Sequence, residues 1–363
     1  MAMIKFSPGW IDRTHDMPEM LKEPVPSRMT WTGATLAQSD DWITRLTPDE
    51  CEEIDAALRG VQRAGLAWGH FGAAGFPLPA LGPRLARCEE EIKNGRGFAL
   101  LRGLDVGRYS LDELKTIYWG LSVHLGTVVS QNALGTLIEE IADKAPKNLG
   151  DSNLRSYVTA QAQPPHADLA DVVGLLCVDR AKEGGTSVIV SMMEIYNRML
   201  RDKPEYLQAL YEGYYHDLRG EGPTGDPDEV SDAPVPVFSY RDGRLRSWFH
   251  GKKIRQGAAK RGIALTPLQR EALDYVERLG TDPEVRMDMQ LERGDIQLLN
   301  NYMALHYRTA FVDGDGHKRL MLRIWIELRD MGDFDPALDR WVRQGVPRQD
   351  WVKDGILPAV GRV

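Results

Sequence analysis

Cysteine is scarce in this chain, and other absences accompany it. Only Cys51, Cys88 and Cys177 occur among 363 residues, and no two of them form a CxxC pair. A disulfide framework is therefore not expected, and a reducing cytoplasm is the expected compartment. The N-terminal sequence lacks the apolar core of a signal peptide, and no run approaches the ~20 apolar residues that span a bilayer. We expect no membrane partner.

An excess of positive charge is missing as well. The formal net charge is −8, with acidic and basic residues mixed along the chain, which argues against a nucleic-acid partner recognised through a basic surface. The longest basic cluster, residues 250–261 (HGKKIRQGAAKR), is interpreted as a solvated or substrate-facing loop. There is no internal repeat, no glycine-rich phosphate loop and no complete calcium-binding loop. The expected partner is a small molecule.

Capping patterns mark the starts of four helices. Each pattern places Glu or Gln three residues after a Ser or Thr, so that the two side chains can satisfy free N–H groups of the first turn. The pairs are Thr47 with Glu50, Ser110 with Glu113, Ser191 with Glu194, and Thr266 with Gln269. The length of the chain suits one large domain or two modest ones.

Short apolar runs bounded by turn residues predict the strands. These runs lie at 97–104, 172–178, 186–191, 294–301 and 320–328, and Asp242-Gly243 predicts a hairpin within 236–249. Most strands are expected after residue 150 and most helices before it, without regular alternation. This order favours an antiparallel sandwich or barrel buttressed by helices. Residues 138–153 and 219–235 are expected to be loose, and the second segment is either a lid or a plain surface loop.

A histidine and a carboxylate, His166 and Asp168, stand two residues apart in front of an apolar run. On a strand both side chains point to the same face, where a metal that takes nitrogen and oxygen ligands would fit. The alternative is a hydrogen-bonded His–Asp pair. A third ligand is expected at His306, which follows another strand-like run. Two histidines and one carboxylate form the facial triad of non-haem Fe(II) oxygenases.

The strand expected at 320–328 has an arginine-bearing face. Arg319, Met321, Arg323 and Trp325 alternate with Leu and Ile residues, which form the ordinary core side. Buried guanidinium groups need an anion close by, and a dicarboxylate cosubstrate bound in bidentate fashion would supply one. The alternative for each arginine is a structural ion pair with Asp or Glu.

Together these features resemble the taurine dioxygenase/TfdA-like superfamily of Fe(II)- and 2-oxoglutarate-dependent dioxygenases. The resemblance covers residues 95–330 and depends on GFALLRGL, HLGTVVSQNALG, PPHADLADVVGLLCV, AKEGGTSVIVS, GDIQLLNNYMALHYRTAF and RLMLRIWIEL, in the family's order. It implies a mainly β fold with α: a double-stranded β-helix, or jelly roll, with packed outer helices. A helical segment (1–94) would pack on the core (95–330), which would carry inserted loops, and a C-terminal extension (331–363) would follow.

The resemblance also implies roles for single residues. Fe(II) would be held by His166, Asp168 and His306. Arg319 would bind the distal carboxylate of 2-oxoglutarate, with Ser187, or else Thr186, as the hydroxyl partner, and Arg323 would line the same pocket. Halogenating relatives lack a carboxylate ligand, so Asp168 argues for hydroxylation or desaturation. Gln131 and Asn301 are expected to contact substrate, with structural hydrogen bonds as the alternative.

The implied reaction uses O₂ and 2-oxoglutarate to oxidise an unactivated C–H bond of a small polar substrate, amino-acid-like or acidic, with succinate and CO₂ as coproducts. Hydroxylation is favoured over desaturation or oxidative cyclisation. Two other classes stay open: a jelly-roll protein that binds metal without turnover, and a zinc hydrolase with the same ligands. The C-terminal residues, including Trp341, Trp351, Ile356 and Leu357, are expected to pack on their own domain, with a homo-oligomer as the alternative.

Overall fold

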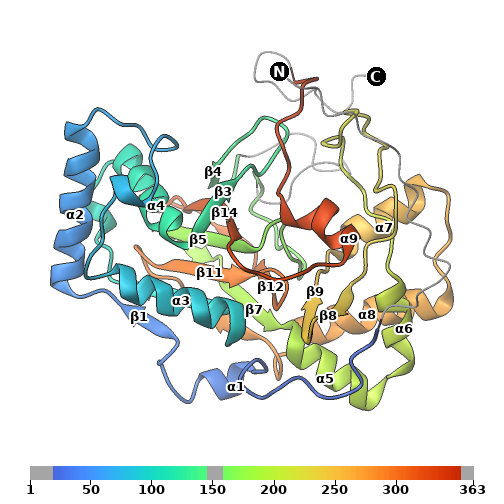
Figure 1. Cartoon of the computed structure of the whole chain (residues 1–363). Helices are drawn as coiled ribbons and strands as arrows, with labels where there is room; N and C mark the ends of the chain where they lie inside the picture. Colours follow the sequence, from blue (N-terminus) through green and yellow to red (C-terminus); the bar gives the residue numbers. More distant parts are fainter. Residues whose placement is uncertain (1–18, 145–157, 353–363) are drawn as a thin grey trace.

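The structure, a computed structural model, describes residues 19–144 and 158–352 (Figure 1). It is a mixed α/β arrangement with several β-sheets and with helices around them. The expected combination of strands and helices is confirmed, but the expected concentration of helices before residue 150 is wrong. Helices α5–α8 all lie between β7 and β10, in the second half of the chain.

The predicted strands are confirmed apart from their end residues. The strands of the described residues are β1 (Ile43–Arg45), β2 (Phe98–Arg102), β3 (Gly126–Val129), β4 (Ile138–Ile141), β5 (Val172–Asp179), β6 (Glu183–Gly184), β7 (Ser187–Ser191), β8 (Phe238–Arg241), β9 (Arg244–Ser247), β10 (Met287–Met289), β11 (Ile296–Asn300), β12 (Ala304–Arg308), β13 (Phe311–Val312) and β14 (Leu320–Leu328). Strand β4 lies where a loose segment was expected. That expectation is wrong for its four residues, because they pair with the central strand β14, and residues 145–153 lie outside the described part.

Two sheets supply most of the site. The larger has the order β1-β2-β11-β5-β14-β3, with β4 also paired to β14. Its central strands β11, β5 and β14 pair in antiparallel fashion. The smaller sheet has the order β10-β7-β12 and is antiparallel too. Strand β12 carries His306 and strand β14 carries Arg323, so the site draws residues from both sheets.

Helices α2, α4, α5 and α8 begin where the capping patterns predict. The helices of the described residues are α1 (Gly33–Leu36), α2 (Pro48–Arg63), α3 (Gly82–Asn94), α4 (Leu111–Leu125), α5 (Met192–Asp202), α6 (Glu205–Glu212), α7 (Gly251–Lys260), α8 (Pro267–Thr281) and α9 (Pro336–Leu338), with 3₁₀ turns at Ala73–Gly75 and Val106–Arg108 and a π turn at Asp339–Arg343. Full capping boxes form at α2, α4 and α8. At α5 the Ser191 hydroxyl accepts from the Glu194 N–H, while the Glu194 carboxylate accepts from Arg198.

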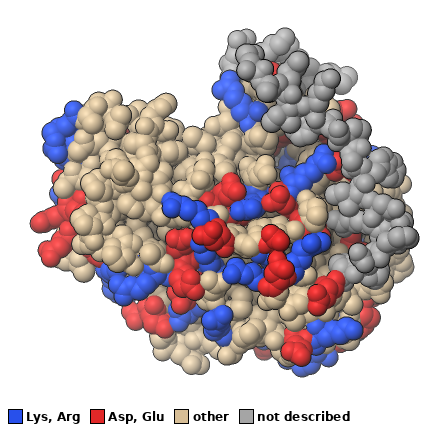
Figure 2. Space-filling model, viewed as in Figure 1, with Lys and Arg blue, Asp and Glu red and all other residues tan. Residues whose placement is uncertain are grey.

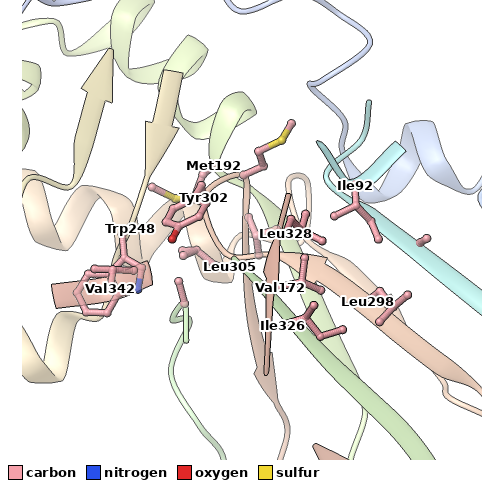
Figure 3. Close-up of a cluster of buried hydrophobic side chains, with 14 of the residues drawn as sticks. Ile92, Val172, Met192, Trp248, Leu298, Tyr302, Leu305, Ile326, Leu328 and Val342 are labelled. Atoms are coloured by element: carbon pink, nitrogen blue, oxygen red, sulfur yellow. The ribbon is translucent and has the colours of Figure 1, made fainter. Parts of the chain in front are cut away.

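Helices α3 and α4 pack on the larger sheet, and a buried apolar cluster joins them to it. In Figure 3, Ile92 of α3 lies close to Val172 of β5, Leu298 of β11 and Ile326 of β14. On β14 the alternate residues Leu322, Ile324, Ile326 and Leu328 belong to this cluster, as the strand period requires. Because removal of these apolar side chains from water fixes β5 and β14, it also fixes the opposite face of β14, where Arg323 lies.

The C-terminal extension packs on its own chain, as expected, throughout its described residues. Leu338 and Val342 are buried in the main cluster. The indoles of Trp341 and Trp351 donate to the Asp232 carboxylate (3.0 Å) and to the Gly222 carbonyl (3.0 Å). Both partners belong to the segment 219–235, which is therefore held by the extension. The two remaining apolar residues of the prediction, at 356 and 357, lie outside the described residues.

The basic cluster at 250–261 is mostly helix α7, so its interpretation as a loop is wrong. Lys253 is buried, and the Lys260 ammonium lies 2.7 Å from the carboxylate of the fully buried Asp217. On the face shown in Figure 2, Lys and Arg residues alternate with Asp and Glu residues. Within the described ranges, no helix is both long and apolar enough to cross a membrane.

Candidate active site

The segment that contains His166 and Asp168 is extended but lies ahead of β5, not in it. The N–H of His166 donates to the His306 carbonyl (3.1 Å), and the N–H of His306 donates back to the His166 carbonyl (2.9 Å). A second antiparallel bridge joins His166 to His250. These bonds hold the segment between β12 and the residues that precede α7, so that the spacing of two residues still brings both side chains to one place.

The three predicted metal ligands come together. One donor atom from each of His166, Asp168 and His306 lies within 4.8 Å of the others, and this is the group of metal-binding side chains found in the described residues. The carboxylate of Asp168 is 4.0 Å from His166 Nε2 and 3.7 Å from His306 Nε2. Both distances are too long for a hydrogen bond but allow one ion between the atoms to contact each of them.

The electrostatics leave each group in the form that binds a cation. Burial lowers the pKa of His166 and that of His306, the latter to about 3, so both imidazoles are neutral at physiological pH. Burial by itself would raise the pKa of Asp168, but Arg323 and the two histidines outweigh it and hold that pKa well below its usual value. Two neutral imidazoles and one carboxylate are the ligand set that a divalent cation requires.

The tautomer of His166 also fits a metal. Its Nδ1 lies 2.9 Å from the Pro164 carbonyl oxygen, and since a carbonyl can only accept, Nδ1 carries the proton. The lone pair is then on Nε2, the nitrogen that faces Asp168. The residues present therefore fit an iron ion in both charge and orientation.

Four groups orient Asp168. Its Oδ2 accepts from the Trp325 indole (2.9 Å) and lies 3.3 Å from Arg323 Nη1. Its backbone N–H donates to the Asn301 amide oxygen (2.9 Å), and its carbonyl accepts from the Trp248 indole (2.9 Å). The carboxylate is thus fixed at both its backbone and its side chain.

One pocket joins these ligands to the predicted cosubstrate residues. Its lining includes His166, His306, Ser187, Arg319 and Arg323 together with Ile141, Gln163, Leu175, Leu291, Tyr307, Arg308 and Met321. Met321 shares the arginine-bearing face, so the alternation expected along β14 is confirmed. The expected anionic partner thus has a cationic pocket beside the triad.

Arg319 is the notable cation of this pocket. It is 8% exposed, and its Nη1 is buried without a hydrogen-bond partner in the described residues. Burial lowers the pKa of Arg319 to about 10, so the group stays charged at neutral pH. The alternative of a structural ion pair receives no support there, whereas Arg323 does contact Asp168. A buried charge of this kind calls for an anion.

The two hydroxyl candidates differ in position. Ser187 is buried, lines the pocket and donates to the Gln297 amide oxygen (3.0 Å). Thr186 is absent from the pocket lining, and its hydroxyl accepts from Gln290 (2.8 Å) on the outside. The geometry favours Ser187.

The two predicted substrate contacts lie behind the site. The Gln131 amide accepts from Arg323 Nε (2.6 Å) and donates to the carbonyls of Arg323 and Leu137 (2.9 Å each). The Asn301 amide accepts from Asp168 N–H and donates to the Ala170 carbonyl (2.9 Å). These are the structural hydrogen bonds that were given as the alternative for both residues. A contact of Gln131 or Asn301 with substrate stays a prediction.

Sequence reasoning missed several residues close to the site. Arg308 follows His306 by two positions on β12 and lines the pocket, so the strand period could have found it. The ring of His250 lies 5.2 Å from that of His166, and Arg219 Nη2 lies 3.0 Å from His250 Nε2. No spacing pattern links residues 166, 219 and 250, so these contacts follow only from the tertiary structure.

Comparison with known proteins agrees with this geometry. Residues 61–325 match the family model described as taurine catabolism dioxygenase TauD, TfdA family. The chain belongs to this family. Membership confirms the resemblance inferred from the motifs and the predicted dioxygenase class.

Two curated relatives share much of the chain. It is 33% identical over 332 residues to FR-33289 synthase of Streptomyces rubellomurinus, and the aligned region covers 90% of this chain and 97% of that protein. It is 29% identical over 313 residues to the taurine hydroxylase-like protein SAT17 of Stachybotrys chartarum, which covers 82% of this chain and 78% of the relative. Both relatives therefore match most of their length.

Solved structures share the fold at low identity. An asparagine oxygenase in complex with Fe(II), 2S,3S-3-hydroxyasparagine and succinate matches 79% of this chain and 93% of its own, with a TM-score of 0.61 at 15% identity. The non-haem iron oxygenase OrfP with Fe, succinate and (3S)-hydroxy-L-Arg matches 78% of this chain and 94% of its own, with a TM-score of 0.59 at 15% identity. The similarity extends over most of each chain.

Proposed function

We propose that this protein is an Fe(II)- and 2-oxoglutarate-dependent dioxygenase that hydroxylates an unactivated C–H bond of a small, polar, amino-acid-like substrate. The observation that carries the proposal is the triad His166, Asp168 and His306, two of whose members, His166 and His306, line one pocket with the buried Arg319. A metal-binding cluster alone is common to many activities. A buried cation beside it is specific to a site that also takes a dianionic cosubstrate.

The chain's own residues then have separate roles. His166, Asp168 and His306 hold Fe(II), and Arg319 binds the distal carboxylate of 2-oxoglutarate with the help of Ser187. Gln131 fixes Arg323, which in turn contacts Asp168. Iron supplies the activation of O₂. In balance, 2-oxoglutarate, O₂ and a substrate C–H bond give succinate, CO₂ and a C–OH bond.

We propose in addition that the two sheets form a double-stranded β-helix, with residues 95–330 as its core, 1–94 as a packed helical segment and 331–363 as the extension. Three facts support this arrangement: the family membership, the antiparallel pairing around β5 and β14, and the common apolar cluster. A cytoplasmic location is supported by the three cysteines, which the structure leaves as free thiols.

The amino-acid-like substrate is supported by the hydroxyasparagine and hydroxyarginine complexes of the two structural relatives, an asparagine oxygenase and OrfP. Desaturation or cyclisation would use the same residues, because the pose of the substrate decides between these outcomes. A metal-binding protein without turnover would bind 2-oxoglutarate but release no succinate. A zinc hydrolase would have no use for Arg319.

The test is a screen of amino acids and small organic acids with the purified protein, Fe(II), 2-oxoglutarate and O₂. Succinate release that depends on one substrate, with a product that gains one oxygen atom, is the expected result. A product that has lost two hydrogens would show desaturation instead. Arg319→Ala is expected to abolish succinate release, whereas Arg293→Ala, at an exposed arginine, leaves it unchanged. Succinate release that is insensitive to Arg319→Ala would contradict the proposal.

A further inference from the structure

His166 is flanked on both edges of its backbone. On one edge it pairs with His306, and the pocket that contains Arg319 extends from there. On the other edge it pairs with His250, and the Ala167 N–H donates to the Phe249 carbonyl (2.8 Å). The site therefore has a second side, away from the cosubstrate pocket, which the residues before α7 define.

A positive charge stands on this second side. Arg219 Nη2 lies 3.0 Å from His250 Nε2, and since a guanidinium cannot accept, it donates to the imidazole. The His250 imidazole thus orients Arg219, and its ring lies 5.2 Å from that of His166.

Hydrogen bonds hold the backbone around Arg219 in an unusual conformation. Arg219 has a φ of 57°, in the left-handed region that costs a non-glycine residue about 1 kcal/mol. The carboxylate of the buried Asp217 accepts the Arg219 N–H (2.8 Å), and Lys260 of α7 holds that carboxylate. The Leu218 N–H donates to the Glu229 carbonyl (3.0 Å) across the segment.

Helix α7 adds to the positive potential of this region. It begins directly after His250, and its first turn contains Lys252 and Lys253 but no acidic residue. The N-terminus of a helix carries partial positive charge, which ordinarily selects acidic residues for the first turn. Lys252 and Lys253 thus add positive charge to the first turn of the helix that follows His250.

We propose that Arg219, backed by His250, binds an oxyanion of the substrate, as a carboxylate, sulfonate or phosphonate. The inference depends on the proposed function, because it assigns the Arg319 side of the triad to 2-oxoglutarate and the Arg219 side to the substrate. It gives segment 219–235 a role in specificity. An anion held there would lie on the opposite backbone edge of His166 from the cosubstrate pocket.

The experiment uses calorimetric titration of the anaerobic Fe(II) complex, in two steps. 2-Oxoglutarate is titrated first. Acetate, methanesulfonate, methylphosphonate and neutral acetamide are then titrated into the saturated complex of the wild type, Arg219→Gln and Arg219→Lys. Arg244→Gln, at an exposed arginine of the β8–β9 hairpin, is the matched control. The first step tests the proposed function and the second step tests only the Arg219 site.

We expect at least one of the three anions to bind the wild type and the Arg244→Gln control more tightly than acetamide does. Arg219→Gln should weaken the binding of that anion about tenfold or more, because one charge-assisted hydrogen bond is lost. The affinity for 2-oxoglutarate should be unchanged. The anion affinity of Arg219→Lys, which keeps the charge, should lie between those of the wild type and Arg219→Gln. If Arg219→Gln fails to fold, the affinity of Arg219→Lys decides the test. Equal anion affinity in wild type and variants, or no preference over acetamide, would overturn the inference. Absence of 2-oxoglutarate binding to the wild type would overturn the proposed function itself.

Discussion

Trp325 shows how single residues act through the triad. Its indole N–H donates to Asp168 Oδ2 at 2.9 Å, in a site where the carboxylate is buried. Hydrogen bonds to a metal ligand commonly change metal affinity by a factor of 10–100. We therefore predict that Trp325→Phe weakens Fe(II) binding about tenfold, measured by anaerobic titration, without loss of the fold.

Trp42→Phe is the matched control for this prediction, because the Trp42 indole donates to the carbonyls of Leu36 and Ser39, outside the site. It should leave Fe(II) affinity unchanged. If both variants bind Fe(II) like the wild type, the indole bond does not orient Asp168 for the metal.

Buried histidines give the metal-free protein a distinct pH dependence. Burial lowers the pKa of His166, His216, His250 and His306 in the folded chain, so below about 6.5 the unfolded chain binds protons that the folded chain does not. Each such group lowers the free energy of unfolding by about 1.4 kcal/mol per pH unit as the pH falls. Asp171, with a pKa raised by burial to about 6, acts in the opposite direction between pH 6 and 4, but it is one group against four.

We therefore predict that urea unfolding of the metal-free protein shows falling stability from pH 6.5 to pH 4.5. His216→Phe, away from the triad, should remove the contribution of one histidine from the slope of stability against pH. His70→Phe, at an exposed position, should not change this slope. A wild-type stability that is flat over this range would show that the imidazoles are not held neutral.

At the residue scale, the sequence was informative where chemistry needs an unusual residue type. His166, Asp168 and His306 stand out because polar side chains precede or follow apolar runs, and Arg319 and Arg323 stand out by strand alternation. Gln131 was placed near the site, but its bond to Arg323 was not predictable. That bond and the Arg219–His250 contact join residues far apart in the chain, and no local pattern encodes them.

At the scale of elements, the four predicted helices, α2, α4, α5 and α8, each have a Ser or Thr cap. Helices α3, α6 and α7 were not predicted, and their N-cap residues are Leu81, Pro204 and His250. None of these has the hydroxyl or carboxylate of a common cap, so the pattern used for the other helices could not find them. The strands were predictable because their apolar runs are short and bounded by turn residues.

The C-terminal extension gives a prediction at this scale. Leu338 is fully buried in the main cluster, and the backbone of residue 346 pairs with that of Gln131. Leu338→Ala should lower the free energy of unfolding by about 2–5 kcal/mol and should also weaken 2-oxoglutarate binding, because Gln131 holds Arg323. Urea unfolding and anaerobic titration measure the two effects.

Leu268→Ala is the control, since Leu268 is 41% exposed on α8. It should change stability by less than about 0.5 kcal/mol. An equally small effect of Leu338→Ala would show that the extension does not belong to the folded unit.

For the whole molecule, one apolar cluster runs from Val25 near the start of the described residues to Val342 in the extension. It includes Ile54 of α2 and Ile92 of α3 from the N-terminal segment, along with the central strands. Segments that share one core unfold together. We predict that unfolding curves from circular dichroism and from tryptophan fluorescence superimpose. Two separate transitions would show that the segments 1–94 or 331–363 fold independently.

The central claim is that the triad and Arg319 form one site for iron and 2-oxoglutarate. The most direct test is an anaerobic ultraviolet–visible titration of the metal-free protein with Fe(II) and then with 2-oxoglutarate. The account predicts the weak visible charge-transfer band of the chelated complex, lost in both His306→Ala and Arg319→Ala. Absence of this band in the wild type, although Fe(II) is bound, would contradict the account and favour a metal-binding protein or a hydrolase.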